Sequence, residues 1–556
     1  MVRRPWSRLP MDPFAAGSPQ EVIERVSKQL GCSMTSRDVA EYFDQHDKLR
    51  DLRREFLVPK VSDLPQSDLT LVDGSEDCIY FVGNSLGLQP KNTKKYIDEE
   101  LEKWAKIGAH GHVMGSRPWA WAENNLEAIM AKVVGAKPEE VALLNGLTVN
   151  LHLLMLAFYK PTSKRHKIIL EEKAFPSDHY AVESQIRLRG FDPSESMVHL
   201  KPQAGEDTLR TEDIVSTIER EGDSVAVVML GGVQYYTGQL FNMEVITKAG
   251  QAQGCYVGFD CAHAVGNAEL RLHDWGVDFA CWCTYKYMNS GAGGLAGAYI
   301  HEKHASTVKP ALLGWWGHKL DTRFQMTNVM SLQPGVSGFR LSNQPILLVC
   351  PLQASLEYKR HLSTTSNSQT PNSTMAKTKE LSKDTRNKIE DLHEAGKTES
   401  AIEIGLLHEE VTLPDESSTQ IHRTCRVNPY VVIRDTIFNK TTMSDLRKKS
   451  VLLTGYLEHL LKHYYSEDKS ELRKPHVRII TPSNPAERGC QLSLSFSVPI
   501  RAIFQELEKR GVACDMREPD VLRVAPVPLY NSFTDVHRFI SVLGAALEAS
   551  KQPKQH

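Results

Sequence analysis

Short apolar runs alternate with longer amphipathic stretches from residue 61 to residue 343, and this alternation most limits the possible folds. Such runs are the length of buried strands, and the segments between them have room for helices. This order is typical of a mostly parallel sheet with helices on both faces. We therefore predict an α/β fold whose ligands bind at the carboxyl ends of strands. The predicted strands are residues 79–82, 141–144, 167–170, 225–230, 256–260 and 279–284.

The rest of the chain has a different organisation. An apolar helix is predicted just after the alternating region, and the closing region mixes strand-like runs at 478–481, 491–498 and 521–525 with helices at 500–510 and 535–550. This mixture predicts a smaller C-terminal α+β domain. The predicted parts are an N-terminal extension and helical arm (1–60), a large domain (61–345), a linking helix (346–357), an inserted segment (358–436), a small C-terminal domain (437–550) and a tail (551–556).

Charge and cysteine content restrict the class of partner. Lys and Arg number 66 against 68 for Asp and Glu, so no strong charge favours nucleic acid or a membrane surface. No apolar stretch approaches the roughly 18 residues of a membrane-spanning helix. The ten cysteines show no disulfide or zinc-binding spacing, so we expect reduced thiols and no metal site. Pro5 and Pro10 interrupt the basic N-terminus, which favours a cytoplasmic protein over a mitochondrial one.

Two predicted strand ends carry chemically useful side chains. The run GCYVGFDCAHAV places Asp260 at the end of a strand and His263 in the following turn. The run DFACWCTYKYMNSGAGG places Tyr285 and Lys286 at the end of another, before a glycine-rich loop. A lysine, an acid for a pyridine nitrogen, phosphate donors and a stacking group are what pyridoxal-phosphate chemistry requires. Taken singly, an aspartate at a strand end, like Asp260, is more often a helix cap than a catalytic residue. A lone lysine, like Lys286, is more often a solvated side chain.

The other two requirements have candidates. Gly146, Leu147 and Thr148 lie where a strand leads into a helix beginning near residue 149, so backbone N–H groups and the Thr148 hydroxyl suit a phosphate. Thr148 as a plain helix N-cap fits the spacing almost equally well. Phe175 follows a strand and is suited to stacking on a cofactor ring, although an aromatic at such a position is more often part of the core.

Several long motifs resemble the kynureninase family. They are FVGNSLGLQP, LTVNLHLLML, AFPSDHYA, GFDCAHAVGN, DFACWCTYKYMNSGAGG, GFRLSN and RVAPVPLYNSF, and the resemblance covers nearly all of the chain outside the insert. It implies a homodimeric, cytoplasmic pyridoxal-phosphate enzyme of fold type I. The implied reaction is the hydrolysis of kynurenine or 3-hydroxykynurenine to alanine and anthranilate or 3-hydroxyanthranilate, in tryptophan catabolism and NAD biosynthesis.

The resemblance also assigns site residues. Lys286 corresponds to the lysine that binds the cofactor aldehyde, and Asp260 to the partner of its pyridine nitrogen. Tyr285, placed on the opposite pleat of the strand from Lys286, corresponds to a phosphate ligand and proton relay. Further implied cofactor contacts are Leu147, Thr148, Phe175, Asp178, Gly231 and His263, with Trp315 and Asn343 from the neighbouring subunit. The implied substrate contacts are His112, Trp315, Asn343 and the carboxylate-binding Arg523. Gly231 departs from the pattern, because relatives carry a serine there.

The insert has its own resemblance. Residues 375–402 are similar to the start of the DNA-binding region of mariner-superfamily transposases, and capping signals at Ser382 and Thr398 outline a helix-turn-helix. Acidic residues follow where phosphate contacts need Lys or Arg, which disfavours DNA binding. We expect a largely disordered segment without a core, since residues 363–374 are all Ser, Thr, Asn, Gln or Pro.

Two alternatives remain open at this stage. One is another fold-type-I activity, such as a cysteine desulfurase or an aminotransferase. Tyr285 before Lys286 disfavours a desulfurase, which commonly has His at that position. The other is a variant that the insert has made inactive, with a binding role instead.

Overall fold

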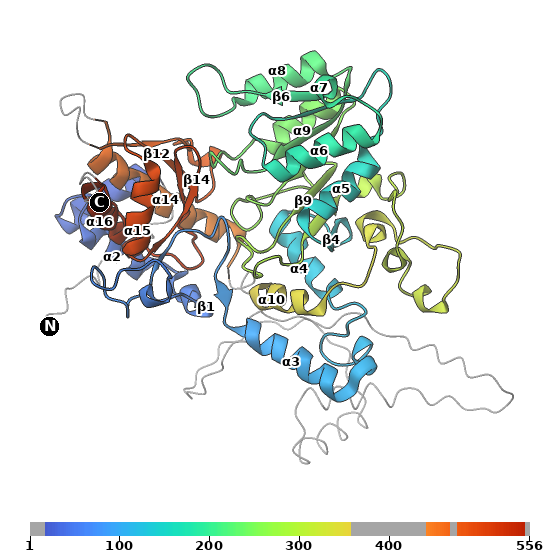
Figure 1. Cartoon of the computed structure of the whole chain (residues 1–556), viewed down its shortest axis with the longest axis horizontal. Coiled ribbons are helices and arrows are strands. Elements are labelled where there is room, and N and C mark those ends of the chain that lie inside the picture. Colours follow the sequence, from blue (N-terminus) through green and yellow to red (C-terminus); the bar gives the residue numbers. More distant parts are fainter. Residues whose placement is uncertain (1–16, 357–440, 468–474, 551–556) are drawn as a thin grey trace, which may run out of the picture. The chain divides into compact units, whose positions relative to one another are not determined.

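The computed structural model describes residues 17–356, 441–467 and 475–550. A seven-stranded sheet forms the large domain, in the order β4-β10-β9-β8-β7-β5-β6 (Figure 1). All neighbouring pairs are parallel except those of β10, which runs antiparallel to both β4 and β9. The strands are β4 (Val141–Leu143), β5 (Lys167–Glu171), β6 (Met197–Leu200), β7 (Val225–Gly231), β8 (Tyr256–Asp260), β9 (Phe279–Trp282) and β10 (Gly297–Ile300). The mostly parallel sheet predicted from the sequence is confirmed.

Two separate apolar layers cover the faces of this sheet. Ile168 and Val227 contribute to one layer, whereas Ile169 and Val228 contribute to the other, as the period of two in a strand requires. Helices α5 (Leu147–Phe158) and α6 (Pro176–Leu188) pack in the first layer. The second layer is covered by α4 (Asn124–Val134), α8 (Thr211–Glu221), α9 (Met243–Ala252) and α10 (Ile346–Leu356). The strands are therefore buried on both sides, which explains their continuous apolar runs.

The C-terminal region forms a second sheet with its own helices. Its four antiparallel strands lie in the order β11-β12-β15-β14. They are β11 (Val477–Ile479), β12 (Leu492–Phe496), β14 (Asp515–Arg517) and β15 (Val521–Val524). Helices α14 (Met443–Tyr465), α15 (Ile500–Lys509) and α16 (Phe533–Ala549) share a core with these strands. This is the smaller α+β domain that the sequence predicted.

The N-terminal elements pack with the C-terminal core. Ser18 caps α1 (Pro19–Leu30) through a capping box with Glu21, and α1 contacts α14. Helix α2 (Arg37–His46) contacts α16. The region expected to be a helical arm therefore contributes directly to the core of the small domain.

Two predicted strands differ from the structure. Residues 79–82 were expected in the main sheet, but β2 (Ile79–Tyr80) pairs with β13 (Val512–Ala513) instead. An apolar run of this length identifies a strand but not its partner. The strand predicted at 279–284 ends at Trp282, so Tyr285 and Lys286 lie in the following loop. The assignment of these two side chains to opposite pleats was therefore wrong.

The remaining elements connect these cores. They are β1 (Phe56–Leu57), β3 (Gln89–Pro90), α3 (Asn92–Ile107), α7 (Pro193–Ser196) and short 3₁₀ turns, including η6 (Trp315–Gly317). No helix of the described residues is long and apolar enough to cross a membrane. The predicted insert, residues 358–436, lies outside the described residues.

Candidate active site

The carboxyl ends of three adjacent strands meet at one cavity. Strands β5, β7 and β8 end at Glu171, Gly231 and Asp260, and Gly231 lies opposite Asp260 in the register. The cavity has an empty volume of about 280 Å³. It is lined by Glu171, Phe175, Asp178, Gly231, Val233, Gln234, Tyr235, Asp260, Ala262 and His263. Five of these residues were predicted as cofactor contacts, so the structure brings together side chains far apart in the sequence.

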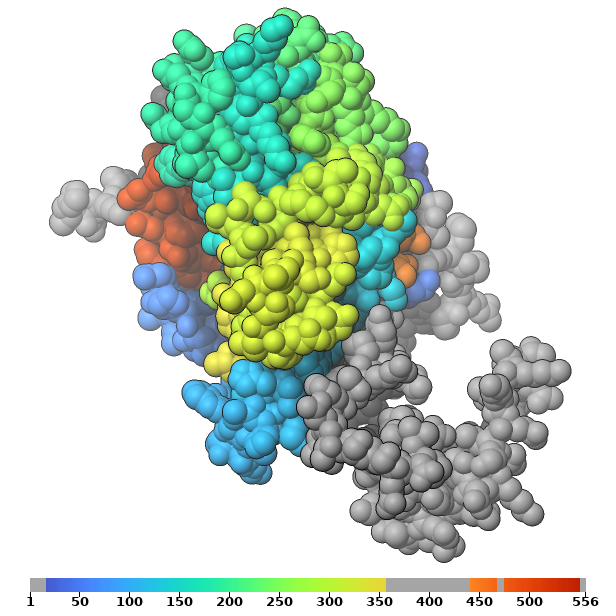
Figure 2. Space-filling view, turned by 90° about the vertical axis from the view of Figure 1, so that its right-hand side faces the viewer, coloured from blue at the N-terminus to red at the C-terminus, as the bar shows by residue number. Residues whose placement is uncertain are grey.

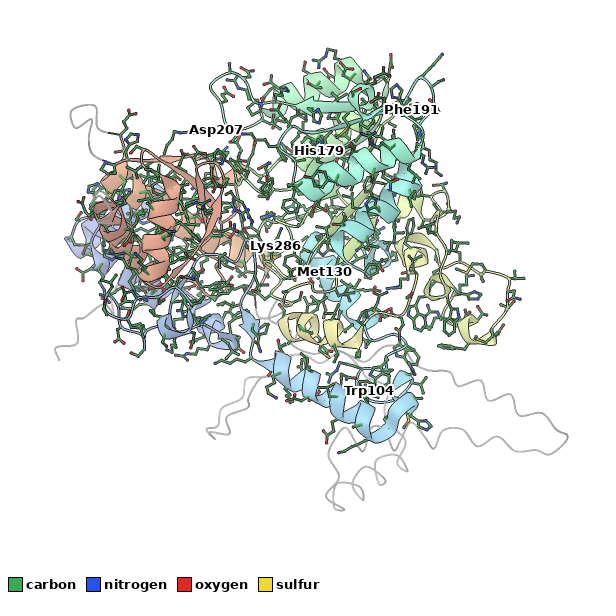
Figure 3. The ribbon with its side chains drawn as sticks, viewed as in Figure 1. Trp104, Met130, His179, Phe191, Asp207 and Lys286 are labelled. Carbon is green, nitrogen blue, oxygen red and sulfur yellow. The ribbon has the colours of Figure 1, made fainter. Side chains whose placement is uncertain are left out.

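Lys286 and His263 lie against each other beside this cavity. The Nζ atom of Lys286 is 2.8 Å from Nε2 of His263, and both residues are buried. Figure 3 labels Lys286, which lies in the loop after β9. Burial, together with the charge of Lys286, holds the pKa of His263 well below its usual value. His263 is therefore neutral, and its Nε2 accepts a hydrogen bond from the Lys286 amine.

The other ring nitrogen of His263 has no partner. Nδ1 is buried and makes no hydrogen bond with the described residues. Since Nε2 accepts, Nδ1 carries the proton of the neutral ring. An unsatisfied buried donor costs free energy, which a bound polar group at this position would offset. This orphaned N–H is one sign that the cavity is built for a polar ligand.

Asp178 and Asp260 form a carboxyl pair in the same cavity. Burial raises the pKa of both groups, and the charge of Asp260 raises that of Asp178 further. Lys286 and the backbone N–H of Ala262, which donates to Asp260 Oδ1 at 2.7 Å, favour the ionised form of Asp260. Asp178 thus holds the proton and donates it to the Asp260 carboxylate. Such a pair presents one negative charge, which suits a protonated pyridine nitrogen.

An aromatic side chain and two helix ends complete the surroundings. Phe175 lies directly before α6, 40% exposed, with Lys286 Nζ 5.8 Å from its ring centroid. Its exposure contradicts the core interpretation of this position. Leu147 and Thr148 begin α5, whose N-cap is Gly146, so Thr148 is not the N-cap. The Thr148 hydroxyl lies 2.7 Å from that of Ser177, in the first turn of α6.

These features fit pyridoxal phosphate. The cavity combines a carboxylate with a raised pKa, an imidazole with an orphaned N–H and a partly exposed aromatic ring, and the Lys286 amine lies beside it against the imidazole. Backbone N–H groups at the start of α5 are suited to a phosphate. Lys286 would hold the aldehyde, Asp260 would face the pyridine nitrogen, and Phe175 would cover the ring.

Arg523 lies behind the cavity wall. It is on β15 and fully buried, and its guanidinium donates to Asp515 and, at 2.8 Å, to the carbonyl of Tyr235, a cavity residue. Its Nε atom has no partner among the described residues and is a spare donor.

Tyr285 is half-buried, and burial raises its pKa.

Three predicted substrate contacts lie outside the cavity of this single chain. His112 is exposed and packs edge-on against Trp119. Trp315 is 46% exposed and donates to the Arg323 carbonyl. Asn343 has a buried side-chain oxygen without a partner among the described residues.

The sequence prediction missed several cavity residues, and Glu171 is the most notable. It is the last residue of β5. A carboxyl that directly follows an apolar run was a usable signal in the sequence. Val233, Gln234 and Tyr235 lie in an irregular segment after β7, for which no periodic pattern exists. Only the folded chain places them in the wall.

A second group of acidic and imidazole side chains lies elsewhere, although the sequence predicted no metal site. Glu140, His273 and His301 place possible ligand atoms within 4.8 Å of one another. Glu140 accepts hydrogen bonds from His273 Nδ1 at 2.9 Å and from the Glu302 N–H at 2.8 Å. His301 Nδ1 accepts from the Lys303 N–H. Because these atoms already make hydrogen bonds, we interpret the group as a structural one that holds three segments of the chain together.

Comparisons with known proteins agree with the geometry. The kynureninase C-terminal domain model matches residues 446–543, and the aminotransferase class-V model matches residues 79–402. Solved structures share the fold alone. A C-DES mutant with glycine covalently linked to the PLP cofactor has a TM-score of 0.59 at 14% identity, covering 86% of this chain and 98% of that one. The cysteine desulfurase of Thermococcus onnurineus has a TM-score of 0.57 at 16% identity, covering 89% and 98%.

Full-length relatives are much more similar. Kynureninase of Mus musculus is 52% identical over 98% of this chain and 100% of its own length. That of Homo sapiens is 52% identical over 97% and 99%. The bacterial kynureninase of Myxococcus xanthus is still 42% identical over 91% and 96%. The chain therefore belongs to the kynureninase family of pyridoxal-phosphate enzymes.

Proposed function

We propose that this member of the kynureninase family hydrolyses the side chain of L-kynurenine or 3-hydroxy-L-kynurenine, with Lys286 as its central catalytic residue. The products are L-alanine and anthranilate or 3-hydroxyanthranilate. The observation that carries the proposal is the cavity that joins the Lys286–His263 pair to the Asp178–Asp260 pair. Full-length identity of 52% to kynureninases supports this reaction over that of a desulfurase or an aminotransferase.

Pyridoxal phosphate, when bound, supplies an electron sink next to the substrate's α-carbon. Lys286 is the residue that holds the cofactor aldehyde and then moves the proton of the α-carbon through Nζ. A neutral His263 suits this task, because it accepts from Nζ without adding a second positive charge. His263 therefore orients the amine.

The acidic pair and the helix ends hold the other parts of the cofactor. Asp260 keeps the pyridine nitrogen protonated, and Asp178 retains its own proton as a hydrogen-bond donor. Leu147 and Thr148 offer N–H and hydroxyl groups to the phosphate. Tyr285 is a further phosphate-side hydroxyl and moves a proton to the alanine carbon. Gly231 offers no side chain, and a Cβ there would lie 3.2 Å from Glu171 Oε1.

Arg523, His112, Trp315 and Asn343 are assigned to the substrate. Arg523 is a rigid guanidinium with a spare Nε donor, suited to the substrate's α-carboxylate. His112, Trp315 and Asn343 are assigned to the aromatic ring. Since Trp315 and Asn343 lie outside this chain's cavity, we assign them to the site of a neighbouring subunit.

An exposed apolar surface supports this homodimer. Leu312, Leu313, Trp315, Phe324, Met326 and Val329 are between 46% and 76% exposed. Figure 2 shows the segment that contains them, lime to yellow, on the face toward the viewer. Exposed apolar side chains gathered in one segment of the chain favour a protein interface there. Covering it with a second copy would also bring Trp315 to a composite site.

We place the reaction in the cytoplasm, as a step of tryptophan catabolism that leads to NAD biosynthesis. The nine cysteines of the described residues are free, and eight of them are buried, as suits a reducing compartment. The direct test of substrate choice compares kcat/KM for kynurenine and its 3-hydroxy derivative. We expect the hydroxylated substrate to be preferred, because His112 and Asn343 offer it polar partners. A preference for plain kynurenine would contradict this assignment.

A further inference from the structure

Glu171 is a buried acid of the cofactor cavity to which the mechanism above gives no role. It closes β5 and is 5% exposed. Its Oε1 accepts a hydrogen bond of 3.0 Å from the N–H of Gly231, the last residue of the neighbouring strand β7. Asp260 closes the next strand, β8. Glu171 therefore shares one sheet edge with the carboxylate assigned to the pyridine nitrogen.

The Glu171 side chain separates two cavities. It lines the cofactor cavity and also a second cavity, of about 350 Å³ empty volume. Gln234 lines both cavities together with Glu171, and it is held in place by its own hydrogen bonds. Gln234 Nε2 donates to the Lys173 carbonyl and Oε1 accepts from the Tyr236 N–H, both at 2.6 Å. Glu171 is thus the acidic group of this shared wall.

Among the described residues, no cation forms an ion pair with Glu171, whereas the charge of Lys286 acts on Asp178 and Asp260. Burial raises the pKa of Glu171 to about 7, and the charge of Asp260 adds to this effect. The charged or titratable groups around the two cavities are Lys173, Asp178, Asp207, Tyr235, Tyr236, Asp260 and His263, with Lys286 behind His263.

We propose that Glu171 is a positioning residue of the cofactor site, whose carboxylate favours the protonated form of the bound cofactor and fixes the end of β7 through Gly231. This inference rests on the proposed function. A negative charge near a group favours its protonated state. Removing that charge should lower the pH at which the bound cofactor loses its proton.

The test uses the visible absorbance of the holoenzyme, titrated from about pH 6 to about pH 10. Glu171→Gln removes the charge but keeps an oxygen for the Gly231 N–H. Glu172→Gln is the matched control, because Glu172 is exposed and pairs with Lys201 at 2.8 Å. We expect the midpoint of E171Q to fall by on the order of one pH unit, while E172Q stays with the wild type.

An unchanged midpoint in E171Q would overturn the inference. If E171Q does not fold, the shorter pair E171D and E171N repeats the comparison of a charged with a neutral side chain. The expected result is then a lower midpoint for E171N than for E171D, and equal midpoints would overturn the proposal. A wild-type protein without a visible cofactor band would instead contradict the proposed function itself.

Discussion

Lys286 Nζ lies 2.8 Å from His263 Nε2, and neither side chain is open to solvent. Because burial and the lysine charge depress the pKa of His263, the imidazole stays neutral and acts as an acceptor. The pair therefore consists of one amine held by a neutral imidazole beside the cavity. This arrangement explains how a buried lysine is kept oriented without a direct carboxylate partner.

The first prediction concerns this hydrogen bond. His263→Phe removes the acceptor of the Lys286 amine, and an unsatisfied buried donor costs roughly 1–3 kcal/mol. If that cost falls on the transition state, kcat/KM should drop by roughly tenfold to a hundredfold. Steady-state kinetics with His199→Phe as the control would measure it. An unaffected H263F enzyme would show that the contact has no role in turnover.

Glu123 gives a prediction about stability and pH. Burial raises the pKa of Glu123 from 4.5 to about 7, although Arg340 partly opposes this. Between about pH 4.5 and about pH 7, the folded state therefore keeps a proton on Glu123 that the unfolded state has lost. Its stabilising contribution is complete below about pH 4.5 and disappears as the pH rises through about 7. The shift corresponds to about 3 kcal/mol in the free energy of unfolding.

Denaturant unfolding of Glu123→Gln across this range would check the Glu123 prediction. The free energy of unfolding of the wild type relative to Glu123→Gln should be highest below about pH 4.5 and should fall as the pH rises through about 7. The exposed Glu139→Gln should instead differ from the wild type by the same free energy at every pH. A flat difference for Glu123→Gln would contradict the assignment.

Arg523 gives a prediction about substrate binding. Arg523→Ala would leave the buried Asp515 with only the partly exposed Arg517 as its ion-pair partner among the described residues, so a large loss of stability would obscure the kinetics. Arg523→Lys keeps the charge but not the planar set of donors. We expect KM to rise more than kcat falls. Arg517→Lys, which also pairs with Asp515 but is 40% exposed, is the control and should change neither. A pure kcat effect in R523K would argue against carboxylate binding.

The composite site gives a prediction of subunit complementation. Lys286→Ala and Asn343→Ala chains should each be nearly inactive alone. If Asn343 serves the neighbouring subunit, a mixed dimer contains one site with both native residues. Mixing the two variants should then restore up to about a quarter of wild-type activity per chain if subunits exchange at random. Absence of recovery, with exchange shown by mass spectrometry, would place Asn343 in its own subunit's site.

Residues 358–436 give a prediction about the insert. Lengthening a surface loop costs only about 0.6 kcal/mol per doubling, so the insert should not abolish folding by its length. Removing these residues should preserve or increase activity and raise the melting temperature. A deletion that folds but loses activity would mean that the segment has acquired a function.

Much of the fold followed from local sequence patterns. The runs at β5, β7 and β8 are continuously apolar because both faces of the sheet are covered, and their lengths were predicted to within a residue. Strand β2 shows the limit, since its partner β13 lies more than 400 residues away in the chain. Pairing over such a distance depends on tertiary packing, which no local pattern records.

The site residues were likewise predicted only in part from local sequence patterns. Asp260, His263 and Lys286 were predicted from strand ends and turns; Asp260 and His263 line the cavity, and Lys286 lies against His263 beside it. The loop position of Lys286 was missed because apolar Cys283 and β-branched Thr284 extend the strand-like run beyond the last strand pairing at Trp282. Glu171 and Tyr235 carry no motif, and their place in the wall depends on how three strands end together.

The central claim is that this chain cleaves kynurenine-type substrates through Lys286. The direct measurement incubates the purified holoenzyme with each substrate and quantifies alanine together with anthranilate or 3-hydroxyanthranilate. We predict equal amounts of alanine and aromatic product from the wild type, and none above background from Lys286→Ala. Turnover by the Lys286→Ala protein equal to that of the wild type, or no product from a wild type that carries its cofactor, would contradict the account.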